Sequence, residues 1–243
     1  MTDLRALARV PLLQPSPLDS YRGIADGKRL EHPHALLISD GADENFAAVF
    51  GPIPVAEFLS LAGAFFDDTA YEVVVESDTA SSFEEYLVTV DWDCVEEEIA
   101  MVLTEIPATT PRPSASLTIA AVTTDRAYED YMTVVPGNRA WVPSLKAATD
   151  PDVGLFVGYA DGRPVVTSRL TRYGEVAEIT GVQTLPEFRR RGYGRALTWA
   201  AIAAARQRGC RTITLTATAM GYPLYLAMGF VEVCAYRAYQ PRS

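Results

Sequence analysis

The residues with the clearest chemistry form one stretch, Glu187-Phe188-Arg189-Arg190-Arg191-Gly192-Tyr193-Gly194-Arg195. Three arginines precede two glycines that are one residue apart. Glycine lets the main chain come close to a ligand, and consecutive amides at the start of a helix point toward an anion. Arginine adds positive charge and donors whose geometry matches phosphate oxygens. The stretch therefore predicts a site for a phosphate-bearing molecule.

The patterns on both sides place this stretch at a strand–loop–helix junction. Apolar alternation predicts strands, and alanine-rich periodicity with glycine after the last turn predicts a helix. The elements expected here are a strand over Val176–Leu185, a helix over Arg195–Arg208 followed by Gly209, a strand over Arg211–Thr218, a short helix from Pro223 to Gly229, and a strand over Phe230–Tyr239.

The residues between 117 and 170 predict further elements of the same half. They are a strand over Leu117–Val122, a helix over Asp125–Val134, a short helix near Pro143–Ala148, and strands over Leu155–Tyr159 and Pro164–Leu170. Asp161-Gly162 between the last two strands is a hairpin signal.

The first half predicts the same strand–helix–strand–helix–strand order. Its elements are Phe46–Phe50, a helix whose apolar stripe runs from Val55 to Phe66, Tyr71–Glu76, a helix over Ser82–Val90 with Ser82 and Glu85 at capping-box spacing, and Ile99–Ile106. In this copy Gly51-Pro52-Ile53-Pro54 replaces the arginine–glycine stretch, and its prolines lack amide donors. We therefore expect that the first copy does not bind the same ligand.

A proline-rich linker over Pro107–Ser116 separates the halves, and we place the domain boundary inside it, giving domains 1–112 and 113–243. Residues 1–116 carry 21 Asp/Glu and 6 Lys/Arg, whereas residues 117–243 carry 10 and 15. The acidic half would repel nucleic acid and attract a cationic substrate, and a merely solvated acidic surface is the alternative.

Composition excludes several other classes. No apolar run approaches the length of a membrane span, and residues 1–17 do not resemble a secretory signal, so we expect a cytoplasmic protein with no membrane partner. Three widely separated cysteines favour free thiols. His32 and His34 lack further ligands for a metal, and we expect them in an exposed loop. Few lysines and many alanines are typical of a GC-rich bacterial source.

Two motifs together resemble a known family. Arg189-x-x-Gly192-x-Gly194 is similar to the first signature of the GNAT (Gcn5-related) N-acetyltransferases, and Leu224-Tyr225-Leu226-Ala227-Met228-Gly229-Phe230 to the second. Thr218 stands where the family often has asparagine. The resemblance covers residues 117–243 and implies an α/β (α+β) fold, the GNAT acyl-CoA N-acyltransferase fold. Its twisted mixed β-sheet, flanked by helices, splays open between Val176–Leu185 and Arg211–Thr218, and the first half is a degenerate GNAT-like repeat.

The resemblance also implies the roles of individual residues. Acetyl-CoA would be the cosubstrate, and no metal would be needed. Residues implied to bind acetyl-CoA are Arg189, Arg190, Arg191, Gly192, Tyr193, Gly194 and Arg195 at the diphosphate and Val182, Gln183 and Thr184 along the pantetheine arm. Tyr225 would donate a proton to the departing thiolate, and Glu178 is a candidate base, with ordered water as the alternative.

The expected activity is N-acetylation of a primary amine, in a small molecule or in a peptide or protein, by direct attack in a ternary complex. The expected partner is an amine substrate, with a cationic amine favoured by the acidic half, and a homodimer is left open. Trp141, in the loop after Asn138, is a candidate wall of the acceptor pocket or a packing residue. The alternative function is a non-catalytic acyl-CoA-binding sensor or interaction module, which would need the loop but not Tyr225.

Overall fold

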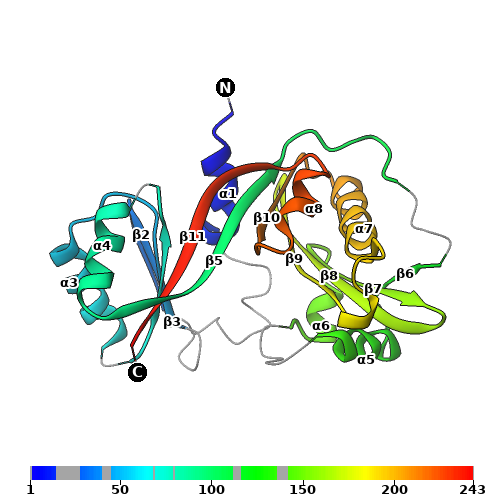
Figure 1. Ribbon diagram of the computed structural model, residues 1–243, viewed down its shortest axis with the longest axis horizontal. Coiled ribbons are helices and arrows are strands. Elements are labelled where there is room, and N and C mark those ends of the chain that lie inside the picture. The colour runs from blue at the N-terminus through cyan, green and yellow to red at the C-terminus, as the bar shows by residue number, and fades with distance from the viewer. Residues whose placement is uncertain are drawn as a thin grey trace. The chain divides into compact units, whose positions relative to one another are not determined.

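The chain forms two compact units, and the computed structural model describes residues 2–14, 28–39, 45–67, 69–78, 80–111, 116–135 and 142–242 (Figure 1). Unit 1 comprises residues 1–22, 102–215 and 229–231, and unit 2 comprises residues 23–101, 216–228 and 232–243. Each unit therefore combines segments from both halves of the sequence.

Unit 1 contains a mixed sheet, because one of its strand pairs is parallel and the others are antiparallel. In hydrogen-bonded order the strands are β10 (Thr212–Ala217), β9 (Val176–Thr184), β8 (Arg163–Tyr173), β7 (Val153–Ala160) and β6 (Thr118–Ala121). The β9–β10 pair is parallel, and the other three pairs are antiparallel. The unit also contains α1 (Leu4–Leu13), α5 (Asp125–Val134), α6 (Leu145–Ala148) and α7 (Tyr193–Gln207).

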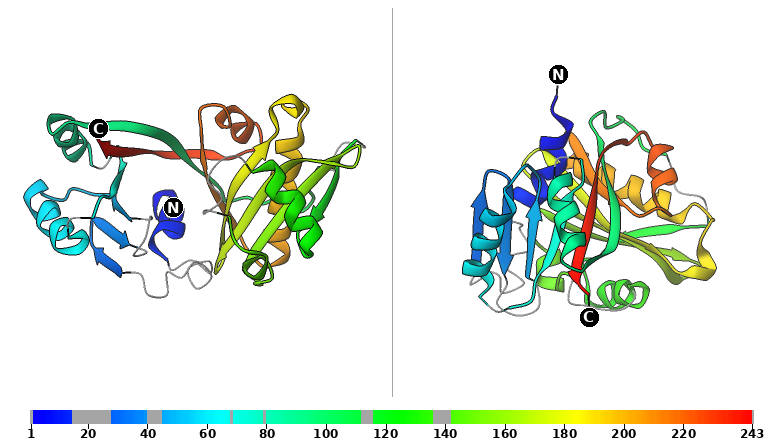
Figure 2. Two further views of the ribbon diagram at one scale, coloured as in Figure 1. Left: turned by 90° about the horizontal axis from the view of Figure 1, so that it is seen from below. Right: turned by 60° about the vertical axis from the view of Figure 1, so that its left-hand side comes forward.

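Helices cover both faces of this sheet, as Figure 2 shows for α5 and α7. Tyr131 of α5 packs in one cluster with Leu155 and Val157 of β7. A Cβ atom at Gly158 of the same strand would approach Leu197 of α7 to 2.8 Å. Because neighbouring residues of a strand point to opposite faces, α5 and α7 lie on opposite sides of the sheet.

The strands of unit 2 are also paired both parallel and antiparallel. In hydrogen-bonded order its strands are β1 (Lys28–His32), β2 (Ala35–Ser39), β3 (Asn45–Val49), β4 (Glu72–Glu76), β11 (Val231–Pro241) and β5 (Trp92–Leu103). The β3–β4 pair is parallel, and β4 pairs antiparallel with β11. The helices are α3 (Val55–Phe66), α4 (Ser81–Thr89) and α8 (Tyr222–Leu226). Phe58 of α3 and Phe83 of α4 meet edge to face in the core, with ring centroids 4.6 Å apart.

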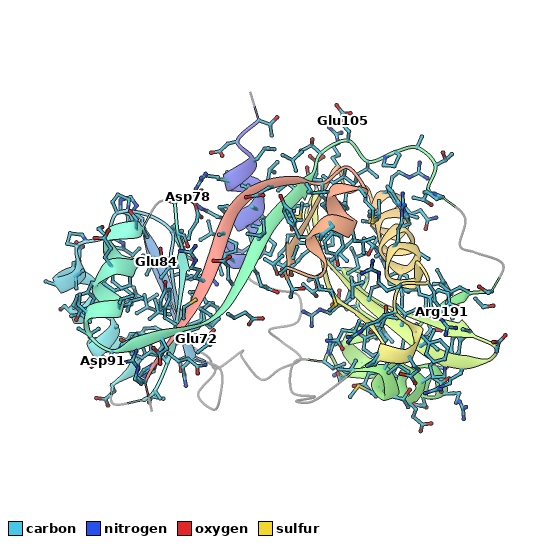
Figure 3. The ribbon with its side chains drawn as sticks, viewed as in Figure 1. Glu72, Asp78, Glu84, Asp91, Glu105 and Arg191 are labelled. Atoms are coloured by element: carbon cyan, nitrogen blue, oxygen red, sulfur yellow. The ribbon has the colours of Figure 1, made fainter. Side chains whose placement is uncertain are left out.

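A polar cluster around Glu84, labelled in Figure 3, ties α4 to the C-terminal strand β11. Its carboxylate accepts hydrogen bonds from Ser77 (3.1 Å), Arg237 (3.1 Å) and Tyr239 (2.7 Å). Arg237 also pairs with Glu97 of β5. Burial, followed by the hydrogen bond to Glu84, raises the pKa of the Tyr239 phenol, so the phenol remains a donor at neutral pH.

The strand–helix–strand–helix–strand order occurs twice, as β3–α3–β4–α4–β5 and as β9–α7–β10–α8–β11. In both copies the first two strands are parallel. In the first copy the amide of Ile53 donates to the carbonyl of Gly51 (2.9 Å), and Pro52 and Pro54 have no amide hydrogen. The turn before α3 therefore offers few donors to a ligand.

Most expected elements are confirmed with ends that differ by one to three residues. The expected helix over residues 125–134 has the same bounds in the structure. The Asp161-Gly162 hairpin is confirmed, with positive φ at both residues. Helix α7 begins at Tyr193, two residues before the expected start, and Gly209 follows it in the left-handed region at φ 85°.

Three expectations for the first half are wrong. Helix α4 begins at Ser81, and its N-cap residue Ala80 has no side-chain cap, so the Ser82–Glu85 capping box does not form. His32 and His34 are half-buried at the β1–β2 hairpin, where His32 Nε2 lies 3.2 Å from Glu57, rather than in an exposed loop. Strand β5 begins at Trp92 and includes the acidic residues before Ile99.

The predicted domain boundary at residues 112 and 113 lies outside the described residues, and the division into domains 1–112 and 113–243 stays a prediction. No helix in the described parts of the chain is long and apolar enough to cross a membrane.

We expect Gly63→Ala to raise the free energy of unfolding of unit 2 by about 0.5–1 kcal/mol, because alanine is the better helix former. Gly63 lies within α3, and an added Cβ atom would meet no atom within 4 Å. Gly209→Ala is the matched control, since its Cβ is equally unobstructed but its φ is 85°. That substitution should lower the stability of unit 1 by about 1 kcal/mol. Urea unfolding of both variants measures the two signs, and equal signs would contradict the assigned backbone conformations.

Candidate functional site

The sheet of unit 1 opens between its two parallel strands. Pairing of β9 with β10 runs from Val176↔Thr212 to Glu178↔Thr214. Strand β9 then continues to Thr184, still paired with β8 on its other side. The predicted splaying of the sheet is therefore confirmed at these strands. Beyond Glu178, the edge of β9 that faces β10 has no backbone pairs with β10 in the described register. This edge includes Val182, Gln183 and Thr184.

A β-bulge bends β9 within this open part. Thr167 and Arg169 of β8 lie opposite Gln183 and Thr180 of β9, so β9 carries one extra residue. Gly181 adopts a φ of 59° there, which a side chain would strain. The hydroxyl of Thr167 donates to the carbonyl of Gly181 (3.3 Å) and holds the bulge.

The loop after β9 turns sharply into α7. Pro186–Phe188 forms a short 3-10 turn, Arg190 has a φ of 62°, and Gly192 has a φ of 78° at the N-cap of α7. Arginine rarely adopts positive φ, so the loop holds a costly conformation immediately before the helix. The predicted glycine position is thus one that the backbone requires.

The main-chain donors of this loop are the central feature of the site. In the described part of the chain, none of the amides from Arg190 to Arg195 donates a hydrogen bond to a protein acceptor, whereas the next amide, of Ala196, donates to the carbonyl of Gly192 (3.0 Å). The N-cap glycine provides no side-chain cap, and no acidic residue lies in the first turn. Unpaired amides and the positive end of the helix macrodipole together favour an anion here.

The arginine side chains stabilise the loop between β9 and α7 and also give it positive charge. Arg189 Nε donates to the carbonyl of Thr184 (3.1 Å), and Arg191, labelled in Figure 3, donates to the carbonyl of Glu187 (3.1 Å). The guanidinium carbons of Arg163 and Arg191 each lie 5.1 Å from the centroid of the Phe188 ring. These contacts brace the loop from β8 and from within.

Glu187 is the acidic member of this loop. Arg163 pairs with its carboxylate at 2.8 Å. The hydrogen bond from its own amide, and then that from Arg163, lower the pKa of Glu187, so this carboxylate stays charged near neutral pH. The side chains of Arg190 on the loop and Arg195 in the first turn of α7 are exposed as well.

Glu178 lies on the polar face of the sheet, opposite the face that α7 covers. Its neighbours in register are Thr171 of β8 and Thr214 of β10, so the three side chains share one face. Glu178 is half-buried, while Thr171 and Thr214 are buried. Within the described residues, the two threonine hydroxyls have no hydrogen-bond partner. A half-buried carboxylate flanked by unpaired hydroxyls is suited to hold a polar group or a water.

Tyr131 and Arg169 extend this polar face, and neither was among the site residues predicted from the sequence. The hydroxyl of Tyr131 lies 3.7 Å from the Cβ position of the bulge residue Gly181. Arg169 Nε donates to the hydroxyl of Thr180 (2.8 Å). Burial raises the pKa of Tyr131 to about 12, although nearby Arg169 acts in the opposite direction. The alternation of threonines in residues 212–218 was the available signal for this face.

Tyr225 lies on α8, within the second motif. The residue is buried, with 7% of its surface exposed. Pro223 lies in the first turn of α8, and the turn before it is closed by Thr218, whose carbonyl accepts from Gly221 (2.9 Å) and Tyr222 (3.0 Å). A Cβ atom at Gly221 would lie 3.1 Å from the Tyr225 ring, so glycine makes room for that ring. Tyr225 belongs to unit 2, and its catalytic role stays a prediction.

Trp141 and Asn138, expected near the acceptor pocket, lie outside the described residues. Among the residues that are described, no group of three or more His, Cys, Asp or Glu side chains is arranged to hold a metal ion.

A mixed sheet that opens between parallel strands, with unpaired amides at the opening, is the architecture of an acyltransferase, and comparison with known proteins agrees. Residues 119–230 match the sequence model of the Acetyltransferase (GNAT) family, and this segment is a GNAT acetyltransferase domain. A search of curated proteins found no match.

Solved structures share the fold over nearly the whole chain. A GCN5-related N-acetyltransferase from Kribbella flavida aligns with a TM-score of 0.70 at 18% identity, covering 98% of this chain and 96% of that one. A GCN5-related N-acetyltransferase-like protein from Streptococcus suis gives 0.60 at 18%, with 99% and 98% covered. A tandem GNAT protein from the clavulanic acid biosynthesis pathway gives 0.59 at 10%, with 98% and 93% covered.

Proposed function

We propose that this protein is an N-acetyltransferase that transfers the acetyl group of acetyl-CoA to a primary amine by direct attack in a ternary complex. The amine belongs to a small molecule or to a peptide or protein, and the acidic half of the chain favours a cationic one. The observation that carries the proposal is the run of unpaired amides from Arg190 to Arg195 beside an opened strand pair.

The unpaired donors suit the diphosphate of coenzyme A. Consecutive amides at a helix start bind phosphate oxygens without a metal, and the exposed Arg190 and Arg195 add positive charge. The free edge of β9 at Val182, Gln183 and Thr184 offers main-chain groups to the pantetheine arm, which pairs like an added strand. Bound acetyl-CoA supplies a thioester that an amine can attack.

Two side chains move protons in this proposal. Glu178 accepts the proton that the amine nitrogen loses as its bond to the acetyl carbon forms, either directly or through a water held by Thr171 or Thr214. Tyr225 donates its phenolic proton to the sulfur as the carbon–sulfur bond breaks. A half-buried carboxylate and a buried phenol are both shielded from bulk water, which favours such transfers.

Gly192→Ala is expected to weaken coenzyme A binding by about tenfold, because the left-handed N-cap conformation costs alanine 1–2 kcal/mol and its relaxation redirects the amides (about 1.4 kcal/mol per tenfold). Gly209→Ala is the control, since it lies at the other end of α7 with φ 85° and an equally open Cβ position. Calorimetric titration with coenzyme A measures both. Equal losses of coenzyme A affinity in the two variants would show a general effect on stability. The amides from Arg190 to Arg195 would then no longer be the proposed diphosphate site.

Tyr225→Phe is expected to lower kcat by about 100-fold and to leave coenzyme A affinity unchanged, because only the proton donor is lost. Tyr222→Phe on the same helix is the control, since its hydroxyl is exposed and bonds to Glu232. Thiol release with a panel of amines measures turnover. Retained turnover in Tyr225→Phe would exclude the acid role, and tight coenzyme A binding without turnover in the wild type would favour the binding-module alternative.

Glu178→Gln is expected to lower kcat/KM by about 100-fold near neutral pH and to remove the acidic limb of its pH profile, because the amide cannot accept a proton. Glu175→Gln is the control, as Glu175 is exposed near the start of the same strand and pairs with Arg211. The pH dependence of amine acetylation measures the effect. An unchanged acidic limb would assign the base role to ordered water.

A further inference from the structure

Unit 2 contains a cavity at the C-terminal end of α3. The cavity has a volume of about 380 Å³, which is enough for a small organic molecule. Its lining residues all belong to unit 2, and they are Leu59, Ala62, Gly63, Phe66, Asp67, Thr69, Ala70, Tyr71, Trp92 and Pro241. Neither phosphate-loop residues nor the proposed proton-transfer residues are among them.

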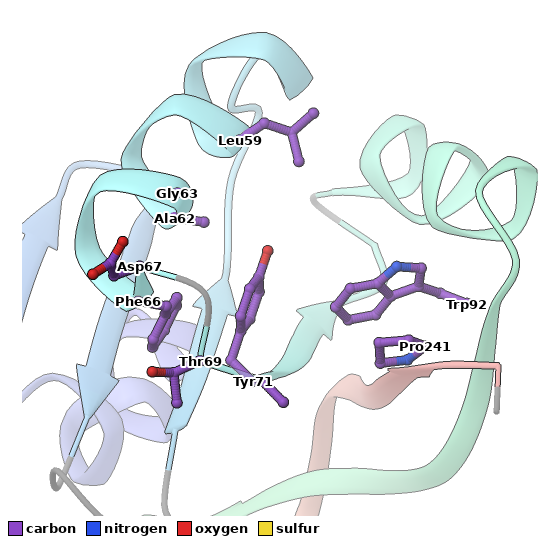
Figure 4. Close-up of a pocket in the computed structure, with 10 residues that line it drawn as sticks. Leu59, Ala62, Gly63, Phe66, Asp67, Thr69, Tyr71, Trp92 and Pro241 are labelled. Atoms are coloured by element: carbon purple, nitrogen blue, oxygen red, sulfur yellow. The ribbon is translucent and has the colours of Figure 1, made fainter.

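Three aromatic rings form the wall of this cavity. Figure 4 shows Tyr71 between Phe66 and Trp92, with Leu59 at the rim. Tyr71 stacks on Phe66 with centroids 4.3 Å apart and planes 10° apart. Its other face is turned toward Trp92, at 5.7 Å and a tilt of 52°. Phe66 and Trp92 thus lie against the two faces of Tyr71, and the half-buried indole of Trp92 is the lining ring whose π system can attract a cation.

The charged residue that lines the cavity is acidic. Among its ten lining residues Asp67 is the charged one, and it lies at the C-cap of α3, where the helix macrodipole is negative. The last turn of α3 contains no basic residue. Arg242, which follows the lining residue Pro241, is paired with Asp91 and Asp93.

The charge of the whole unit acts in the same direction. Over its three segments, unit 2 contains 19 Asp/Glu and 4 Lys/Arg, so its net charge is −15. A field of this sign raises the local concentration of cations and disfavours anions. A neutral apolar ligand would gain nothing from the carboxylate, the helix end or this field.

We propose that this cavity binds a small organic cation, such as an alkylammonium group whose apolar substituents contact Leu59 and Trp92 and whose charge is attracted by the carboxylate of Asp67 at the edge of the cavity. The site shares no residue with the proposed acetyl-transfer site, and it does not depend on the proposed function. It gives the acidic first half of the chain a ligand of its own, rather than only a repulsive or solvated surface.

The helix row that borders the cavity allows a selective block. Leu59, Gly63 and Asp67 follow one another at four-residue spacing, so they lie on one face of α3. Because nothing lies within 4 Å of a Cβ atom at Gly63, a leucine there fits the backbone and projects over the cavity. Ala64→Leu is the matched control, since Ala64 is also exposed on α3 but does not line the cavity.

Ligand-detected NMR titration of the full chain tests the proposal with two probes of nearly equal shape, choline and its neutral isostere 3,3-dimethylbutan-1-ol. We expect saturable choline binding that is at least about threefold tighter than binding of the alcohol. Gly63→Leu should abolish choline binding, Asp67→Asn should weaken it about threefold, and Ala64→Leu should leave it unchanged. The quaternary nitrogen of choline has no lone pair to acetylate, so turnover does not complicate the measurement.

Three outcomes would overturn the inference. Equal binding of the alcohol and the cation would show an apolar hollow without charge preference. Undiminished choline binding by Gly63→Leu would place the cation elsewhere on the protein. Absence of saturable choline binding by the wild type would show that the aromatic wall and Asp67 do not form a cation site.

Discussion

The site in unit 1 depends on main-chain donors that the fold leaves unpaired. A helix cannot satisfy its first amides internally, and side-chain caps commonly do so. In the same unit, Asp3, Thr124 and Ser144 cap α1, α5 and α6. Helix α7 has Gly192 at that position instead, and within the described residues the amides from Arg190 to Arg195 have no acceptor. A missing cap alone is common, since α3, α4 and α8 also lack one. What distinguishes α7 is the coincidence of unpaired amides, a left-handed loop and an opened strand edge.

At β9 and β10 the two faces of the unit 1 sheet differ, because one packs against α7 and the other carries the polar residues of the candidate site. Residues such as Ala177, Ile179 and Ile213 are buried on the side of the sheet that α7 covers. Their neighbours on the other face are Glu178, Thr180 and Thr214, which are polar. Successive residues of a strand point to opposite faces of the sheet, so the neighbouring residues Ala177, Glu178 and Ile179 can serve both faces. The rigid apolar face can therefore position the polar one without contributing to its chemistry.

The sequence predicted the features that depend on local pattern. Gly192 and Gly194 between a strand and a helix were sufficient to predict the loop. Gly192 has the left-handed backbone that glycine favours, whereas Gly194 lies in the first turn of α7. Alternating threonines predicted β10. By contrast, α1 was missed because Pro11 interrupts its helical pattern, and the polar strand Lys28–His32 was missed because it lacks apolar alternation.

Long-range packing accounts for the other differences. Glu84 binds Arg237 and Tyr239 from the far end of the chain, more than 150 residues away, and no local spacing encodes that contact. Tyr131 reaches Gly181 because α5 packs on β7 and β8, and Arg169 reaches Thr180 because β8 and β9 pair. These residues could be placed only once the register of the sheet was known.

The repeated order of elements gives the two halves equivalent helices, α3 and α7, with opposite chemistry at their ends. Helix α7 presents its N-terminal, positive end through a glycine loop, whereas the turn before α3 is closed by prolines and an internal hydrogen bond. The open end of α3 is its C-terminal, negative one, beside aromatic rings and Asp67. Because a macrodipole has both signs, the same strand–helix–strand frame can serve an anion in one copy and a cation in the other. The residues of the turn before each helix decide whether its N-terminal end can bind an anion. Prolines have no amide donor, whereas glycines let the main chain turn its amides toward a ligand.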